Sequence, residues 1–324
     1  MTRLAFLGSP EVAVISLRAL HDAGHDVALV VTAPDRRRGR GSALVPTPVK
    51  ECALELGIPE SSRVADVLDA NVEIGVVVAF GTLIRPEVLQ KVPMVNLHFS
   101  LLPRWRGAAP VERAILAGDD RTGVCLMALE ETLDTGPVYA RVEVPILPGQ
   151  IASELRVTLA SIGADLLVQR LAGGVATLGT PVPQVGEAVY ARKIERSELE
   201  LKWARPAVEL DRVVRVGRAW TTFRGKRFIV ERVRVVDDDP PGEGTEAGGD
   251  KPTRTAAGGG KPTRTAAGTR KPRRPAPGTL LGDEVVCGVG RLELLEVRPE
   301  GRSVQSFDEW QRGARPTAHE RFGT

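Results

Sequence analysis

Apolar residues in the first half of the chain form short runs, separated by stretches with helical spacing. The short runs cover residues 4–7, 27–31, 74–80 and 92–97. Residues 10–23 lie between the first two runs and stop at Gly24, as a helix does. Buried strands that alternate with helices predict an α/β fold, with a Rossmann-like, parallel-rich sheet.

The turn after the first run, Gly8-Ser9-Pro10, lacks the later glycines of a dinucleotide fingerprint, so no nicotinamide or flavin is expected. Residues 108–117 predict a helix with Pro110 in its first turn. Residues 122–129 and 138–144 predict a strand pair, and 151–171 a long amphipathic helix. We therefore expect a first domain at 1–174 and a linker at 175–189, which is rich in Pro and Gly.

The pattern changes after the linker. Residues 213–235 alternate apolar and basic side chains, with Trp220 and Phe223 among them, and residues 280–297 add short strands broken by Gly. This pattern fits a small OB-like β-barrel domain at 190–324 with a basic, aromatic surface, a fold that commonly binds nucleic acids. Any small β domain with a polar outer face fits the pattern equally well.

An insert at about residues 237–278 interrupts these strands. Its repeat, K-P-T-R-T-A-A-G, begins at Lys251 and again at Lys261, with a degraded copy from Lys271. Because such residues cannot bury a core, we expect the insert to be disordered and to loop out of the barrel. We favour an insert without a function over one whose Lys and Arg side chains attract RNA weakly.

Candidate chemistry gathers where the apolar run 92–97 ends. Asn96 and His98 are two positions apart, so on a strand they point to the same face, and Pro103 then stops regular structure. A neutral imidazole beside a carboxamide supplies a proton acceptor and a donor to oxygen, as acyl transfer requires. Asp134, in a turn next to Gly136, is a candidate to orient the ring of His98.

These residues carry a family resemblance. The segment N-x-H-x-S-L-L-P-R-W-R-G-A-A-P, from Asn96 to Pro110, and L-D-T-G at residues 133–136 resemble the methionyl-tRNA formyltransferase family. The resemblance runs along the chain except for the insert. It implies that Asn96, His98 and Asp134 form a catalytic trio that transfers the formyl group of 10-formyltetrahydrofolate to the α-amine of methionyl initiator tRNA. It also implies a folate site made of Phe80, Gly81, Ser100, Leu101, Leu102 and Pro103.

A basic loop follows the second apolar run. It contains Arg36, Arg37, Arg38 and Arg40, with glycines at its end. Such a run is usually a solvated face, but it can also order on a phosphate backbone. The resemblance favours the second interpretation, because the family uses a matching loop on the tRNA acceptor stem.

Composition limits the remaining possibilities. With 324 residues, 42% of them apolar, the chain can form two cores, and its net charge of +3 does not by itself indicate a nucleic-acid partner. Because no segment could span a membrane and no leader precedes the first strand, we expect a cytoplasmic protein, and a monomer. Cys52, Cys125 and Cys287 have neither metal nor pairing spacing, so we expect reduced thiols and no metal.

Two other functions fit part of the pattern. A formyltransferase for a small amine, such as glycinamide ribonucleotide or an amino sugar, would use the same site but needs no basic loop. An RNA-binding module with a degenerate enzyme domain would not need Asn96, His98 and Asp134 together.

Overall fold

The computed structural model describes residues 1–37, 44–236, 275–317 and 320–323. The chain divides into two compact units, which are described separately. Unit 1 contains Met1–Glu200 and Arg212–Ala219, and unit 2 contains Leu201–Asp211 and Trp220–Thr324. The segment 175–189, expected to be a linker, therefore belongs to unit 1 in this division.

A seven-stranded sheet in the order β10-β9-β7-β6-β1-β2-β5 forms the centre of unit 1. Strands β5, β2, β1, β6 and β7 are neighbours in that order and run parallel to one another. At the β7 side of the sheet, β9 pairs with β7 and β10 pairs with β9, both antiparallel. This arrangement confirms the Rossmann-like, parallel-rich prediction. The strands are β1 (Arg3–Gly8), β2 (Asp26–Val31), β5 (Glu60–Ser61), β6 (Ile74–Val78), β7 (Met94–His98), β9 (Arg121–Ala128) and β10 (Val138–Pro145).

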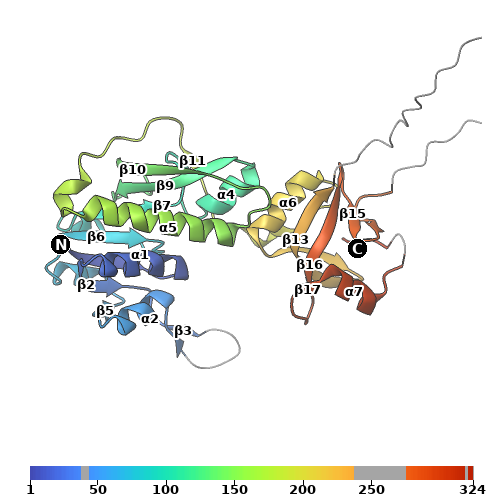
Figure 1. Ribbon diagram of the computed structural model, residues 1–324, viewed down its shortest axis with the longest axis horizontal. Helices are drawn as coiled ribbons and strands as arrows, with labels where there is room; N and C mark the ends of the chain where they lie inside the picture. Colours follow the sequence, from blue (N-terminus) through green and yellow to red (C-terminus); the bar gives the residue numbers. More distant parts are fainter. Residues whose placement is uncertain (38–43, 237–274, 318–319, 324) are drawn as a thin grey trace, which may run out of the picture. The chain divides into compact units, whose positions relative to one another are not determined.

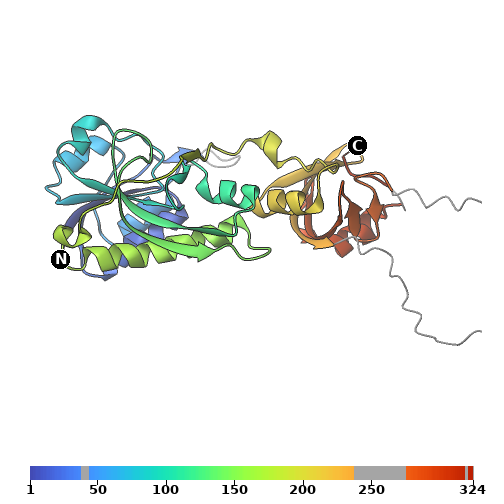
Figure 2. The same ribbon diagram turned by 90° about the horizontal axis from the view of Figure 1, so that it is seen from above.

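Helices cover both faces of this sheet. Along β1, Leu4 and Phe6 join one buried cluster, whereas Ala5 and Leu7 join another, because alternate side chains of a strand point to opposite faces. Figures 1 and 2 show α5 lying along the sheet. The helices of unit 1 are α1 (Glu11–Asp22), α2 (Pro48–Glu55), η1 (Val64–Leu68), α3 (Pro86–Leu89), α4 (Pro110–Ala117), α5 (Ala152–Leu171), η2 (Val175–Leu178) and η3 (Arg196–Leu199).

Local sequence sets the ends of these helices. The Thr47 side chain accepts a hydrogen bond from the Lys50 amide and caps α2, which begins at Pro48. Helix α4 also begins at a proline and ends at Gly118, whose φ of 75° is left-handed. The predicted boundaries of α4 are therefore accurate to within two residues.

Two short pairings extend unit 1. Strands β3 (Arg36–Arg37) and β4 (Leu44–Val45) form an antiparallel hairpin. Strand β8 (Arg104–Arg106) pairs in parallel with β11 (Val189–Tyr190), and Val182 bridges Val138. Residues of the 175–189 segment are thus hydrogen-bonded to the sheet domain.

Unit 2 is built on an antiparallel sheet in the order β12-β13-β16-β15-β14, with β17 paired to β16. Near the C-terminus, Phe322 bridges Phe223 at the end of β12, and Arg321 bridges Thr279 beside β14. These two bridges join the sheet edges, as expected for a small barrel. Its elements are β12 (Ala219–Phe223), β13 (Lys226–Val236), β14 (Leu280–Leu281), β15 (Glu284–Val286), β16 (Arg291–Pro299), β17 (Gln305–Ser306) and α7 (Phe307–Ala314).

Two features of residues 213–235 differ from the prediction. Their first residues belong to helix α6 (Ala207–Val216), where Leu210, Val213 and Val214 are buried at helical spacing. In addition, several of the aromatic and basic side chains that were expected on a free surface are buried or paired. Phe223 is buried in the core, while Arg232 and Arg234 pair with Glu296 and Glu293 on β16.

Candidate active site

Strand β7 carries Asn96 and His98 to its carboxyl end. It lies between β6 and β9, so the two residues stand where ligands bind in open α/β sheets. Asn96 is half-buried, and only 6% of His98 is exposed. The chain leaves the sheet at Phe99 and continues through a loop into β8.

A backbone carbonyl orients the imidazole of His98. The Trp105 oxygen lies 2.7 Å from Nε2 of His98. Because a carbonyl can only accept, Nε2 carries the proton, and in the neutral ring Nδ1 has the free lone pair. Trp105 itself has a left-handed φ of 66°, which is uncommon for a residue other than glycine.

Asp134 faces the other side of the ring. Its Oδ2 atom lies 3.6 Å from Nδ1 of His98 and accepts a 2.7 Å hydrogen bond from the Gly107 amide. Asp134 is 7% exposed and has a left-handed φ of 53°. The turn needs Gly136, because a Cβ there would lie 1.9 Å from the Ala128 oxygen. The structure thus brings together His98 and Asp134.

The four residues of the predicted folate-binding segment 100–103 differ in burial. Ser100 and Leu102 are buried, and the Ser100 hydroxyl donates to the carbonyls of Arg104 at 2.7 Å and Trp105 at 3.3 Å. Leu101 and Pro103 are half-buried. The first pair therefore shapes the loop from inside, whereas the second pair is accessible to a ligand.

The segment after this loop is anchored by Asp119. Its carboxylate accepts two hydrogen bonds from Arg104, at 3.0 and 2.7 Å, and one of 2.7 Å from the Trp105 indole. The Arg104 guanidinium also lies 4.3 Å from the centre of the Trp105 ring. Asp119 therefore holds the residue whose carbonyl orients His98.

Gln184 connects β8 to the Asp134 turn. Its Oε1 accepts from the Arg106 guanidinium at 3.0 and 2.7 Å, and its Nε2 donates to the carbonyls of Asp134 and Gly136 at 2.9 and 2.8 Å. The sequence pattern pointed to neither Asp119 nor Gln184. Neither residue lies in a motif, and Gln184 belongs to a segment interpreted as a linker.

Helix α4, which follows the loop, is tied to residues 192–198. Arg113 donates to the carbonyls of Arg192 and Lys193 and pairs with Glu198 at 2.6 Å. Hydrogen bonding from Arg113 lowers the pKa of the Glu198 carboxyl from its ordinary value of 4.5 to about 2. The pair holds this segment against α4.

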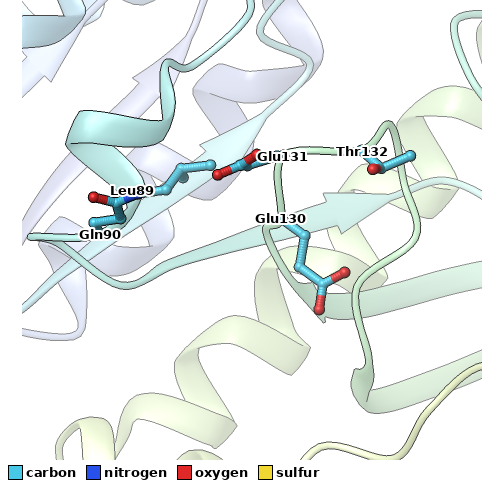
Figure 3. Close-up of a pocket in the computed structure, with 5 residues that line it drawn as sticks. All are labelled: Leu89, Gln90, Glu130, Glu131 and Thr132. Carbon is cyan, nitrogen blue, oxygen red and sulfur yellow. The ribbon is translucent and has the colours of Figure 1, made fainter.

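The other predicted folate residues lie on the loop after β6. Phe80 is half-buried and Gly81 is exposed, with open space where a Cβ would stand. A cavity of about 350 Å³ opens between α3 and the turn that leads to Asp134 (Figure 3). It is lined by Leu89, Gln90, Glu130, Glu131 and Thr132.

The predicted RNA-binding arginines are only partly described. Arg36 and Arg37 are exposed on the β3–β4 hairpin, whereas Arg38 and Arg40 lie outside the described residues. The repeat insert also lies outside them, at residues 237–274. The four residues that follow, 275–278, are described, and Gly278 donates to the carbonyl of Val286.

The part of the chain that the structure describes contains neither a metal-binding cluster nor a membrane-spanning helix. Within residues 1–37, 44–236, 275–317 and 320–323, no group of three or more His, Cys, Asp or Glu side chains could hold a metal ion. No helix in those ranges has the length and apolar character to cross a membrane. Cys52, Cys125 and Cys287 are free and buried.

Comparison with solved structures supports the fold. The chain matches a methionyl-tRNA formyltransferase from Clostridium thermocellum with a TM-score of 0.54 and 14% identity, over 72% of this chain and 93% of that one. It also matches an N-formyltransferase from Helicobacter canadensis, solved with folinic acid and dTDP-3-aminofucose, with a TM-score of 0.61 and 14% identity. That match covers 91% of this chain and 99% of the other.

Sequence comparison gives the family. Residues 2–171 match the model "Formyl transferase", and residues 193–315 match "Formyl transferase, C-terminal domain". A methionyl-tRNA formyltransferase from Acidothermus cellulolyticus is 38% identical over 99% of both chains. Another, from Symbiobacterium thermophilum, is 42% identical over 75% of this chain and 79% of its own. The chain therefore belongs to the methionyl-tRNA formyltransferase family.

Proposed function

We propose that this enzyme transfers the formyl group of 10-formyltetrahydrofolate to the α-amine of methionyl initiator tRNA. The observation that carries the proposal is the 38% identity to a methionyl-tRNA formyltransferase over 99% of both chains. The approach of His98 to Asp134, at 3.6 Å, supplies the acid–base pair that the reaction needs.

The reaction makes one C–N bond and breaks another. The neutral α-amine attacks the formyl carbon and forms a tetrahedral adduct, whose oxygen gains negative charge. The amine nitrogen then loses a proton, and the bond between the formyl carbon and N10 of the folate breaks. N10 gains a proton, so the products are the formylated amine and tetrahydrofolate.

Three side chains take roles in these steps. Asn96 donates its amide hydrogen to the oxygen of the adduct. The free lone pair on Nδ1 of His98 accepts the amine proton, and the Asp134 carboxylate 3.6 Å away stabilises the resulting imidazolium. The protonated ring then supplies a proton to N10.

We assign the folate to the loops that follow β6 and β7, at the edge of the sheet where Asn96 and His98 lie. Accessible positions for its ring system are Phe80, Gly81, Leu101 and Pro103. Ser100 and Leu102 support this surface from within, as their burial suggests. The N-formyltransferase from Helicobacter canadensis with the same fold was solved with folinic acid, which is consistent with this assignment.

We assign the tRNA to the β3–β4 hairpin. Arg36 and Arg37 are exposed there, and Arg38 and Arg40 follow them in the sequence. Guanidinium groups bind phosphate oxygens in a bidentate manner, and such contacts position an RNA without reading its sequence. An enzyme of translation initiation with this partner acts in the cytoplasm.

The test is transfer of labelled formyl from 10-formyltetrahydrofolate to methionyl initiator tRNA, with free methionine and glycinamide ribonucleotide as parallel acceptors. We expect label only on the charged tRNA. Label on a small acceptor would retain the active site and reject the RNA partner. No label on any acceptor would reject the enzyme assignment.

A further inference from the structure

The Gln184 side chain makes four hydrogen bonds, and the proposed mechanism gives them no role. One end of its amide accepts from Arg106, and the other end donates to the carbonyls of Asp134 and Gly136. A guanidinium only donates and a carbonyl only accepts, so these partners determine the orientation of the amide. Gln184 is separated from Asp134 by 50 positions in the sequence.

Both ends of this bridge belong to the candidate active site. Arg106 follows Trp105, whose carbonyl lies 2.7 Å from Nε2 of His98. Asp134 belongs to a turn in which this non-glycine residue has a left-handed φ of 53°. A left-handed backbone is held only where surrounding contacts compensate for its cost. The two hydrogen bonds from Gln184 fall on the carbonyl of this strained residue and on that of Gly136, two positions later.

We propose that Gln184 is a positioning residue, which sets the Asp134 carboxylate at its place beside Nδ1 of His98. The proposal rests on the proposed function, in which this pair moves the amine proton. Gln184 does not touch the reacting atoms. It acts through the turn, while Arg106 ties the same amide to the segment that orients His98.

The chemistry of the bridge explains why a glutamine stands at position 184. The bridge needs an acceptor for Arg106 and a donor for two carbonyls at the end of one side chain. A glutamate supplies only acceptors, so it keeps the contact with Arg106 but sets a negative oxygen against the carbonyls of Asp134 and Gly136. An alanine removes both contacts.

The experiment compares Gln184→Ala and Gln184→Glu with the unchanged enzyme. Gln150→Ala serves as the matched control, since the Gln150 side chain accepts one backbone hydrogen bond from Leu147 and is absent from the candidate site. Two readouts are measured: kcat and KM in the formylation assay, and the hydrogen exchange rate of the Gly107 amide. That amide reports on Asp134 directly, because it donates to Oδ2.

We expect both Gln184 variants to lose kcat on the order of ten- to a hundredfold, as small displacements of reacting groups do. Their KM values should stay within about twofold, and Gly107 should exchange faster. The control should match the unchanged enzyme in both readouts. A Gln184→Glu variant with full kcat, a loss confined to KM, or unchanged exchange at Gly107 would overturn the proposal.

The two readouts also separate this proposal from the proposed function. If the unchanged enzyme formylates no amine, the function is wrong, yet exchange at Gly107 still tests whether Gln184 holds the turn. If the unchanged enzyme formylates methionyl-tRNA and the Gln184 variants match it, only the positioning role is wrong.

Discussion

The carbonyl oxygen of Trp105 lies 2.7 Å from Nε2 of His98 and leaves Nδ1 as the ring atom that faces Asp134. The opposite tautomer would set a lone pair against the carbonyl and lose this hydrogen bond. Trp105 is in turn held by Asp119 through its indole. A chain of contacts therefore runs from the end of α4 to the proton acceptor.

His98 and Asn96 give the most direct prediction. Replacing either with Ala should lower kcat by at least on the order of a hundredfold, because each change removes one group that acts on the transition state. The chain should remain folded, as checked by its melting temperature. His21→Ala, on the exposed end of α1, is the control and should keep full activity. Normal turnover in either site variant would exclude the proposed mechanism.

Asp119→Ala tests the anchor of the loop. The change removes three hydrogen bonds to the carboxylate, so we expect the free energy of unfolding to fall by about 1–3 kcal/mol. It should also lower kcat, since the Trp105 indole is no longer held. The neighbouring Asp120→Ala is the control, because Asp120 uses its backbone carbonyl to bind the Ile146 amide. Equal stability of the two variants would show that Asp119 does not hold the loop.

Gly136→Ala tests the tight packing of the Asp134 turn. The new Cβ would lie 1.9 Å from the Ala128 oxygen, so the turn must move. We expect a loss of about 1–3 kcal/mol in unfolding free energy, together with lower kcat. Gly313→Ala in helix α7 has open space and should instead stabilise the protein by about 0.5–1 kcal/mol. Thermal or urea unfolding measures both; a neutral Gly136→Ala would contradict the structure.

The pair between Glu198 and Arg113 predicts a specific dependence of stability on pH. The pKa of the Glu198 carboxyl falls from 4.5 to about 2 on folding, so the pair stabilises the folded state above pH 4.5. This contribution is lost as the pH falls from 4.5 to about 2, because the carboxylate becomes protonated. The difference in unfolding free energy between the unchanged protein and Glu198→Gln should therefore narrow over that range.

A control for this prediction is Glu209→Gln, since Glu209 forms an exposed pair with Arg205. Exposed pairs contribute little, so this variant should differ from the unchanged protein by less than about 1 kcal/mol at neutral pH. A gap between the unchanged protein and Glu198→Gln that stays constant from about pH 6 to about 2 would argue against the pair as the source.

The β3–β4 hairpin gives a prediction about RNA. Replacing Arg36 and Arg37 with Gln should weaken tRNA binding and reduce the slope of its salt dependence by about 0.7–0.9 for each phosphate that is no longer neutralised. Folate binding should not change. Arg232 and Arg234 serve as controls, because Glu296 and Glu293 already pair with them. A slope that falls in the control but not in the hairpin variant would move the RNA site to unit 2.

Much of the fold follows from local pattern. Strand β1 and helix α4 lie close to their expected boundaries, because the spacing of apolar residues and the position of Pro110 are properties of neighbouring residues. Residues 213–216 are the exception. They were expected to begin a strand, but Val213 and Val214, together with Leu210, form a helical stripe that is buried in the folded chain.

The sequence by itself determined the α/β class, the placement of Asn96 and His98 at the end of β7, and the resemblance to formyltransferases, since each is encoded in adjacent residues. Only the tertiary structure decided which groups surround them. The 3.6 Å approach of Asp134, the Trp105 carbonyl and the Gln184 bridge depend on how turns fold back on the sheet. Contacts between residues far apart in the chain arise from packing, so the local periodicity of the sequence does not predict them.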